Sequence, residues 1–99
     1  MTDERIFFAV LDGNLGRLKK LLAEDKIDPN QTDEYGNTPL LKASAWGKLD
    51  IIIELLKYGA NPNTENSKHE TPLKIAEKNG YKHIARTLLE YGADPNFRK

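Results

Sequence analysis

The 99-residue chain contains no cysteine and carries no formal net charge, because fifteen basic side chains balance fifteen acidic ones. Without cysteine, a disulfide framework and a thiolate metal site are both excluded. The balanced charge argues against nucleic acid or an acidic membrane as the partner, since such partners select a clustered basic excess. The length allows one domain, which we expect to cover residues 1–99.

Long hydrophobic runs are also missing. The apolar stretch near the N-terminus covers only residues 6–11, and it follows the acidic pair Asp3 and Glu4. This pattern supports neither a signal peptide nor a transmembrane span. We therefore expect an intracellular protein, in the cytoplasm or the nucleus, that does not bind a membrane.

Residue types that carry chemistry are sparse. The two histidines, His69 and His83, lie 14 positions apart (83 − 69), without the paired spacing of metal ligands. The sequence has no glycine-rich loop of the kind that cradles phosphate and no serine nucleophile motif. We therefore predict that the chain is not an enzyme and has no catalytic residue, cofactor or metal site.

What the sequence does contain is internal repetition. Three tripeptides recur: Thr38-Pro39-Leu40 as Thr71-Pro72-Leu73, Tyr58-Gly59-Ala60 as Tyr91-Gly92-Ala93, and Asn61-Pro62-Asn63 as Asp94-Pro95-Asn96. The members of each pair are 33 positions apart (71 − 38, 91 − 58 and 94 − 61). A fixed period of this size is typical of stacked repeat architectures.

Helix signals recur with the same period. Thr38 is predicted to cap a helix that has Pro39 in its first position, and Gly59 is predicted to close the following helix. Thr71, Pro72 and Gly92 repeat these signals. Two earlier helices are predicted over residues 2–12 and 15–24, the first with Thr2 as its cap and with acidic residues in its first turn.

The first unit has one extra residue. Gly13 aligns with Gly47 at a spacing of 34 (47 − 13), whereas Pro29 aligns with Pro62 at a spacing of 33 (62 − 29). The insertion must therefore lie between the second predicted helix and the proline turn. Loops tolerate such insertions, because the entropy cost of loop closure grows slowly with length.

The order Gly-x-Thr-Pro-Leu, Ala, Gly, Leu-Leu and Gly-Ala-Asn/Asp-x-Asn resembles the ankyrin repeat. The resemblance covers a divergent unit at about residues 2–32 and two clear units at about 33–65 and 66–98. It implies an all-α repeat solenoid of helix–loop–helix units with β-hairpin-like connectors. Repeat proteins of this kind bind partners on the concave surface, which here is formed by connector tips and first helices.

Two departures from the family pattern carry expectations. The histidine that the family usually has after Thr-Pro-Leu is Leu41 in one unit and Lys74 in the other, so its hydrogen bonds to the hairpin must be replaced or lost. His69 stands where the second unit has Gly36, which predicts a different turn type or a strained φ there.

The family's variable surface positions, together with Lys42, give the predicted partner-binding residues. They are Glu34, Tyr35, Asn37, Lys42, Trp46, Ser67, Lys68, Glu70, Lys78 and Asn79. Trp46 and Tyr35 are the predicted anchors, because aromatic residues are enriched among interface hot spots. Alternatively, Trp46 packs on its own second helix or on Asn79, and Tyr35 packs on the neighbouring hairpin.

Three lysines on successive first helices, Lys42, Lys74 and Lys78, suggest a mild positive strip that faces an acidic partner. The alternative is an ordinary solvated face. Tyr58 and Tyr91 precede the helix-closing glycines, and we expect them to cover helix ends on the back of the molecule.

These features predict a non-catalytic protein–protein interaction module, an adaptor or an inhibitor, that acts as a monomer. The alternative is a fragment of a longer ankyrin array or a scaffold that associates end to end. The third unit keeps Ile84, Ala85 and Leu88 in the pattern of an internal unit, which favours this alternative. Its charged residues favour a solvent-facing cap instead.

Overall fold

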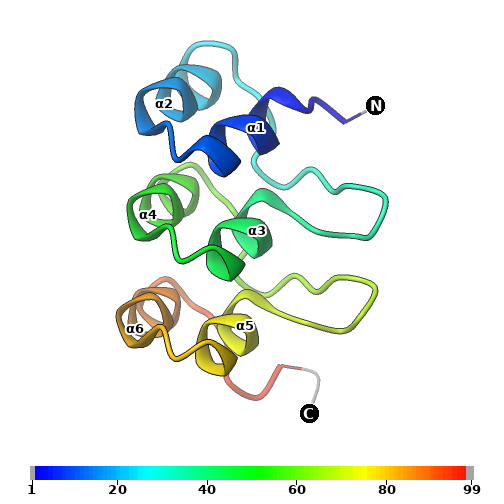
Figure 1. The fold of residues 1–99 in the computed structure, drawn as a ribbon, viewed down its shortest axis with the longest axis vertical. Helices are drawn as coiled ribbons and strands as arrows, with labels where there is room; N and C mark the ends of the chain where they lie inside the picture. Colours follow the sequence, from blue (N-terminus) through cyan, green and yellow to red (C-terminus); the bar gives the residue numbers. More distant parts are fainter. Residues whose placement is uncertain (1, 98–99) are drawn as a thin grey trace.

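The computed structural model describes residues 2–97, which form six helices and contain no strand. Met1, Arg98 and Lys99, the predicted ends of the domain, lie outside the described residues. The helices form three pairs, and their bounds are α1 Arg5–Asp12, α2 Leu15–Ala23, α3 Pro39–Ala45, α4 Leu49–Lys57, α5 Pro72–Lys78 and α6 Lys82–Glu90. Figure 1 shows these pairs stacked in register, with α1, α3 and α5 in one column and α2, α4 and α6 in another. The predicted all-α repeat solenoid is confirmed.

The threonine caps lie where the sequence placed them. The Thr38 hydroxyl accepts a hydrogen bond from the Leu41 amide at 3.2 Å, and Thr71 accepts one from the Lys74 amide at 3.2 Å. A proline occupies the first turn of both helices. Each cap satisfies a helix-end amide that would otherwise have no partner inside the helix.

The predicted start of the first helix is wrong. Helix α1 begins at Arg5, and Glu4 occupies the cap position without a capping bond from its side chain. Thr2 does not cap the helix, because its hydroxyl donates to the Thr32 carbonyl oxygen at 2.8 Å. Asp3 also precedes the helix, and its carboxylate accepts a hydrogen bond from the Arg5 amide at 3.1 Å. Thr2 is thus held by the connector after α2, whereas Asp3 bonds both that connector, through Gln31, and the first amide of the helix.

The extra residue of the first unit lies in the loop after α2. The Ile27 amide donates to the Leu21 carbonyl, six residues back, at 3.0 Å, whereas the Ala60 amide donates to the Leu55 carbonyl, five residues back, at 3.0 Å. Lys26, with φ of 52°, takes the left-handed position that glycine fills in the later units. The expected place of the insertion is confirmed.

Asparagine side chains tie each unit to the next. Asn30 donates to the Gly59 carbonyl at 3.0 Å and accepts from the Asn61 amide at 2.7 Å. Asn63 makes the same two bonds with the Gly92–Asp94 turn, at 3.0 Å and 2.8 Å. This amide ladder fixes the vertical register of the stack, because one side chain satisfies a donor and an acceptor of its neighbour.

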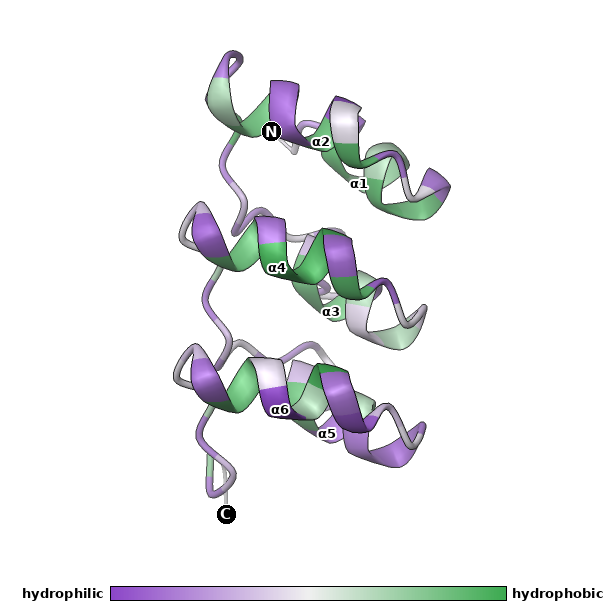
Figure 2. Cartoon of the chain, turned by 90° about the vertical axis from the view of Figure 1, so that its left-hand side faces the viewer, coloured by the Kyte–Doolittle hydropathy of each residue, from purple (hydrophilic) through white to green (hydrophobic). Residues whose placement is uncertain are grey.

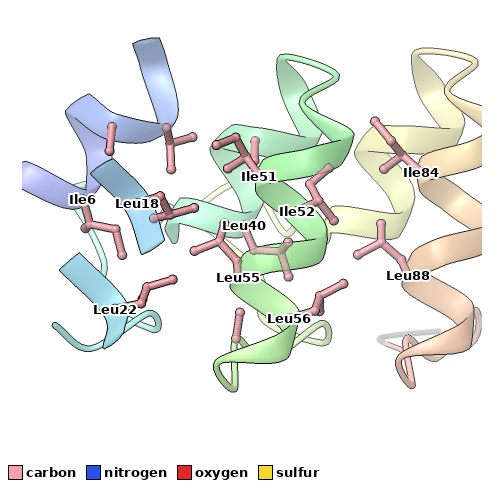
Figure 3. Close-up of a cluster of buried hydrophobic side chains, with 14 of the residues drawn as sticks. Ile6, Leu18, Leu22, Leu40, Ile51, Ile52, Leu55, Leu56, Ile84 and Leu88 are labelled. Carbon is pink, nitrogen blue, oxygen red and sulfur yellow. The ribbon is translucent and has the colours of Figure 1, made fainter. Parts of the chain in front are cut away.

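The hydrophobic core runs through all three units. Figure 3 shows side chains from successive pairs meeting between the helix layers. Ile6, Leu18, Leu40, Ile52, Leu55 and Leu88 are fully buried. They come from both helix columns, so every pair contributes one face to a shared core.

We expect Leu55→Ala to lower the free energy of unfolding by about 2–5 kcal/mol, because it removes buried methyl groups and leaves a cavity. Leu89→Ala is the matched control, since Leu89 is 46% exposed and should cost only about 0.5 kcal/mol. Urea unfolding followed by circular dichroism measures both. An unshifted transition for Leu55→Ala would show that the core has been assigned wrongly.

Candidate functional site

Two polar connectors, the first at residues 31–37 and the second at residues 63–70, project from the column of first helices on the same side of the molecule (Figure 1). Each closes through a backbone hydrogen bond, from Asp33 to the Asn37 carbonyl at 3.0 Å and from Asn66 to the Glu70 carbonyl at 3.1 Å. The connectors are therefore hairpin-like, as the resemblance implied, although neither contains a strand.

The side chains of Asp33 and Asn66 hold the connector tips. Asp33 Oδ1 accepts from the amides of Tyr35 and Asn37 at 2.8 Å and 2.9 Å. One period later, Asn66 Oδ1 accepts from the amides of residues 68 and 70 at 2.9 Å and 3.0 Å. These bonds fix the backbone of each tip, on which Tyr35, Ser67 and Lys68 lie exposed.

The two tips are also bonded to each other. The amide and the hydroxyl of Ser67 both donate to the Tyr35 carbonyl, at 2.9 Å and 2.7 Å. Asn66 Nδ2 donates to Asn37 Oδ1 at 2.8 Å. Tyr35 thus meets the neighbouring hairpin through its backbone, while the whole residue remains 61% exposed.

A groove of about 370 Å³ lies between α3, α5 and the two connectors, and we call it the α3–α5 groove. Its lining includes seven of the ten predicted binding residues: Tyr35, Asn37, Lys42, Trp46, Ser67, Lys68 and Glu70. Glu34 lies in the adjacent groove instead. Lys78 and Asn79 line neither groove, so the structure does not bring them together with the other eight.

The adjacent groove, of about 400 Å³, lies between α1, α3 and the first connector, and we call it the α1–α3 groove. Phe7, Phe8 and Leu11 of α1 form its apolar side. Lys42 and Trp46 line both grooves, so they form the ridge that separates them.

The ridge is built by contacts within α3 and its connector. The Lys42 ammonium lies 5.6 Å from the centroid of the Trp46 ring, a distance that allows a cation–π interaction. The same ammonium lies 3.9 Å from a carboxylate oxygen of Asp33. Trp46 remains 40% exposed. Of the three lysines in the suggested positive strip, only Lys42 lines a groove, and Asp33 opposes its charge.

Several groove residues were missing from the predicted set, notably Phe8 and Ile75. Phe8, Lys42 and Ile75 occupy equivalent positions of the three units, at spacings of 34 (42 − 8) and 33 (75 − 42). Applying the repeat register to Lys42 would therefore have found both. Leu41, which replaces the family's histidine, is buried beside Lys42 and also lines the α3–α5 groove.

Within residues 2–97, no group of three or more histidine, aspartate or glutamate side chains is placed to hold a metal ion. No helix in that part of the chain is long and apolar enough to cross a membrane. Tyr58 and Tyr91 follow α4 and α6 and are each 43% exposed.

Comparison with known proteins connects this arrangement to a family. A family profile described as ankyrin repeats, in three copies, matches residues 6–99. Over 56 residues, 57% of the chain, the sequence is 38% identical to ankyrin repeat domain-containing protein 29 of Danio rerio. Over 50 residues, 50% of the chain, it is 42% identical to the DNA-binding protein RFXANK of Homo sapiens. Each match covers 19% of the relative's own length.

His69 confirms the expectation of an unusual φ, which is 62° where Gly36 has 77°. We expect His69→Gly to raise the free energy of unfolding by up to about 1 kcal/mol, because the left-handed conformation costs a residue with a Cβ roughly 1–2 kcal/mol. The gain is limited by the loss of the 3.5 Å contact between His69, whose side chain is 67% exposed, and Glu65, whose side chain is 20% exposed.

Gly36→His is the reciprocal control for this prediction, measured by the same urea unfolding. It should destabilise the protein, because a Cβ at residue 36 would lie 3.3 Å from the Asn66 Cα. If His69→Gly proved clearly less stable than the parent, the histidine side chain would hold the tip in some other way.

Proposed function

The chain belongs to the ankyrin repeat family, and we propose that it binds another protein along its concave face, as a non-catalytic adaptor or inhibitor. Ankyrin repeats are generally protein–protein interaction modules, and the family is typically non-catalytic. The observation that carries the proposal is the meeting of two grooves at the exposed ring of Trp46.

The residues around this ring have the character of an interface centre. Trp46 is flanked by apolar groove walls, with Phe8 and Leu11 on one side and Leu41 and Ile75 on the other. Polar connector residues surround these walls. Binding hot spots are commonly large aromatic residues near the centre of an interface, enclosed by a polar rim.

The rigidity of the connectors also supports binding on this face. Tyr35 stands on a tip that is held by Asp33 and bonded to the next tip through Ser67. A side chain presented by a fixed backbone loses less conformational entropy when a partner binds. Tyr35 and Trp46 both line the α3–α5 groove, so one partner segment can contact both.

Protein is a better candidate partner than nucleic acid. One relative is named as a DNA-binding protein, but it is matched over only 19% of its length. The present chain has no net charge, and carboxylates line both grooves. DNA-binding surfaces neutralise phosphates with clustered lysine and arginine, which these grooves lack.

We expect Trp46→Ala and Tyr35→Ala each to weaken binding of a partner by more than about 1 kcal/mol, the loss typical of anchoring aromatic residues. Their melting temperatures should stay close to that of the parent, because Tyr35 is 61% exposed, Trp46 is 40% exposed and neither belongs to the buried core. Titration calorimetry measures the affinity, and thermal unfolding is recorded separately. Tyr91→Ala is the control, because Tyr91 follows the C-terminal end of α6 and lines neither groove. Unchanged affinity for a genuine partner in both variants would rule out this face.

A second candidate function is that of a scaffold, in which a second copy stacks on the third unit. Leu56 is 7% exposed, whereas its equivalent Leu89, 33 residues later (89 − 56), is 46% exposed. Leu89, Tyr81 and Ala85 line a groove of about 420 Å³ on α5 and α6. A repeat end that exposes apolar residues favours stacking.

The charges on this end favour the monomer. Lys82 and Arg86 line the same groove, and Figure 2 shows that α6 is more hydrophilic than α4. We therefore expect light scattering across a concentration series to give a constant monomer mass. A mass that rises with concentration, and falls again in Leu89→Lys, would support the scaffold instead.

A further inference from the structure

We propose that the α1–α3 groove binds a partner segment in which an apolar side chain is flanked by lysine or arginine. The inference rests on the proposed function, since this groove is one half of the concave face. It adds the chemistry of the partner, which the geometry of the face alone does not specify.

The groove offers an apolar side chain a place to bind. Phe8 and Leu11 are 58% and 50% exposed. They are three positions apart on α1, so they lie on the same side of that helix. Trp46 completes the groove from α3. Single exposed apolar residues need no explanation, but several large ones around one groove mark an interaction surface.

The rim of this groove is acidic. Glu4, Asp33 and Glu34 line it, against the single positive charge of Lys42. Asp33 already accepts hydrogen bonds from its own connector and faces Lys42 at 3.9 Å. Glu4 and Glu34 are both exposed, and no basic side chain within residues 2–97 forms an ion pair with either.

The nearest arginine is directed to other carboxylates. Arg5 lies 2.7 Å from Asp3 and 3.5 Å from Asp25. The hydrogen bonds from the Arg5 guanidinium hold the pKa of Asp3 below its usual value. Arg5 therefore pairs with neither Glu4 nor Glu34, and both glutamates are exposed to a partner.

In the α3–α5 groove, positive side chains outnumber negative ones, so the charges of the two grooves specify an orientation for a bound partner segment. Lys42 and Lys68 line it, against the one carboxylate of Glu70. That carboxylate also accepts a hydrogen bond from Asn66 at 2.9 Å. A partner segment is therefore expected to place its basic residues over α1 and its neutral or acidic residues over α5. Charge complementarity of this kind sets orientation and association rate more than affinity.

The test uses a phage-displayed library of short random peptides selected on the intact chain. Peptides that lose binding to Trp46→Ala are taken as ligands of the concave face and measured by fluorescence anisotropy. We expect them to be enriched in lysine or arginine beside a leucine or an aromatic residue. Their affinity should fall as salt rises, because salt screens exposed charges.

The deciding variant is Glu4→Gln/Glu34→Gln, which removes two carboxylates and leaves the apolar walls unchanged. We expect it to weaken the selected peptides by roughly threefold to twentyfold at low salt. Glu24→Gln/Glu90→Gln is the matched control, because it changes the net charge equally at exposed positions at the C-terminal ends of α2 and α6. That control should change affinity by less than about twofold.

The outcomes separate the two proposals. If peptides that depend on Trp46 are neutral or acidic, or bind the Glu4→Gln/Glu34→Gln variant unchanged, the basic–apolar partner is excluded while the concave face stands. If no selected peptide depends on Trp46 or Tyr35, both proposals are overturned.

Discussion

The packing of each helix pair against the next is the interaction on which the rest of the structure depends. Leu40, Ile52 and Leu55 of the middle unit are fully buried, and the units on both sides complete their surroundings. Stability in such an array is a sum of unit and neighbour terms, so no pair is self-sufficient. The same stacking aligns the first helices, and the two grooves exist only because those helices repeat side by side.

Scaffold and surface therefore occupy different positions of one repeat. The residues that recur, such as Thr38 and Thr71, cap helices and lie buried. The equivalent positions Phe8, Lys42 and Ile75 differ in every unit and line the grooves, although Ile75 is itself buried. Because the caps and the core are satisfied within the scaffold, substitutions at exposed groove positions such as Phe8 can change this surface without changing the fold.

Much of the fold could be predicted from the sequence because its signals are local and repeated. The Thr-Pro caps, the closing glycines and the place of the inserted residue all follow from spacing. The role of Thr2 could not be predicted in this way, because its hydroxyl bonds a carbonyl thirty residues later. The residues that line the grooves could be predicted in part, because the variable surface positions of the family include Tyr35 and Trp46. These positions do not reveal that two exposed glutamates, Glu4 and Glu34, line the same groove beside α1.

The amide ladder fixes the spacing of the residues that it bonds. Asn30 binds the carbonyl of Gly59 and the amide of Asn61. A residue inserted between Gly59 and Asn61 would therefore break at least one of these two bonds. Asn63 fixes the spacing between Gly92 and Asp94 in the same way. The extra residue of the first unit lies before Asn30, outside the segments that these bonds span. A residue inserted ahead of Asn30 leaves these bonds in place, as the first unit shows, and the addition of a whole repeat would leave them in place too. The repeat is therefore a convenient unit for lengthening this protein.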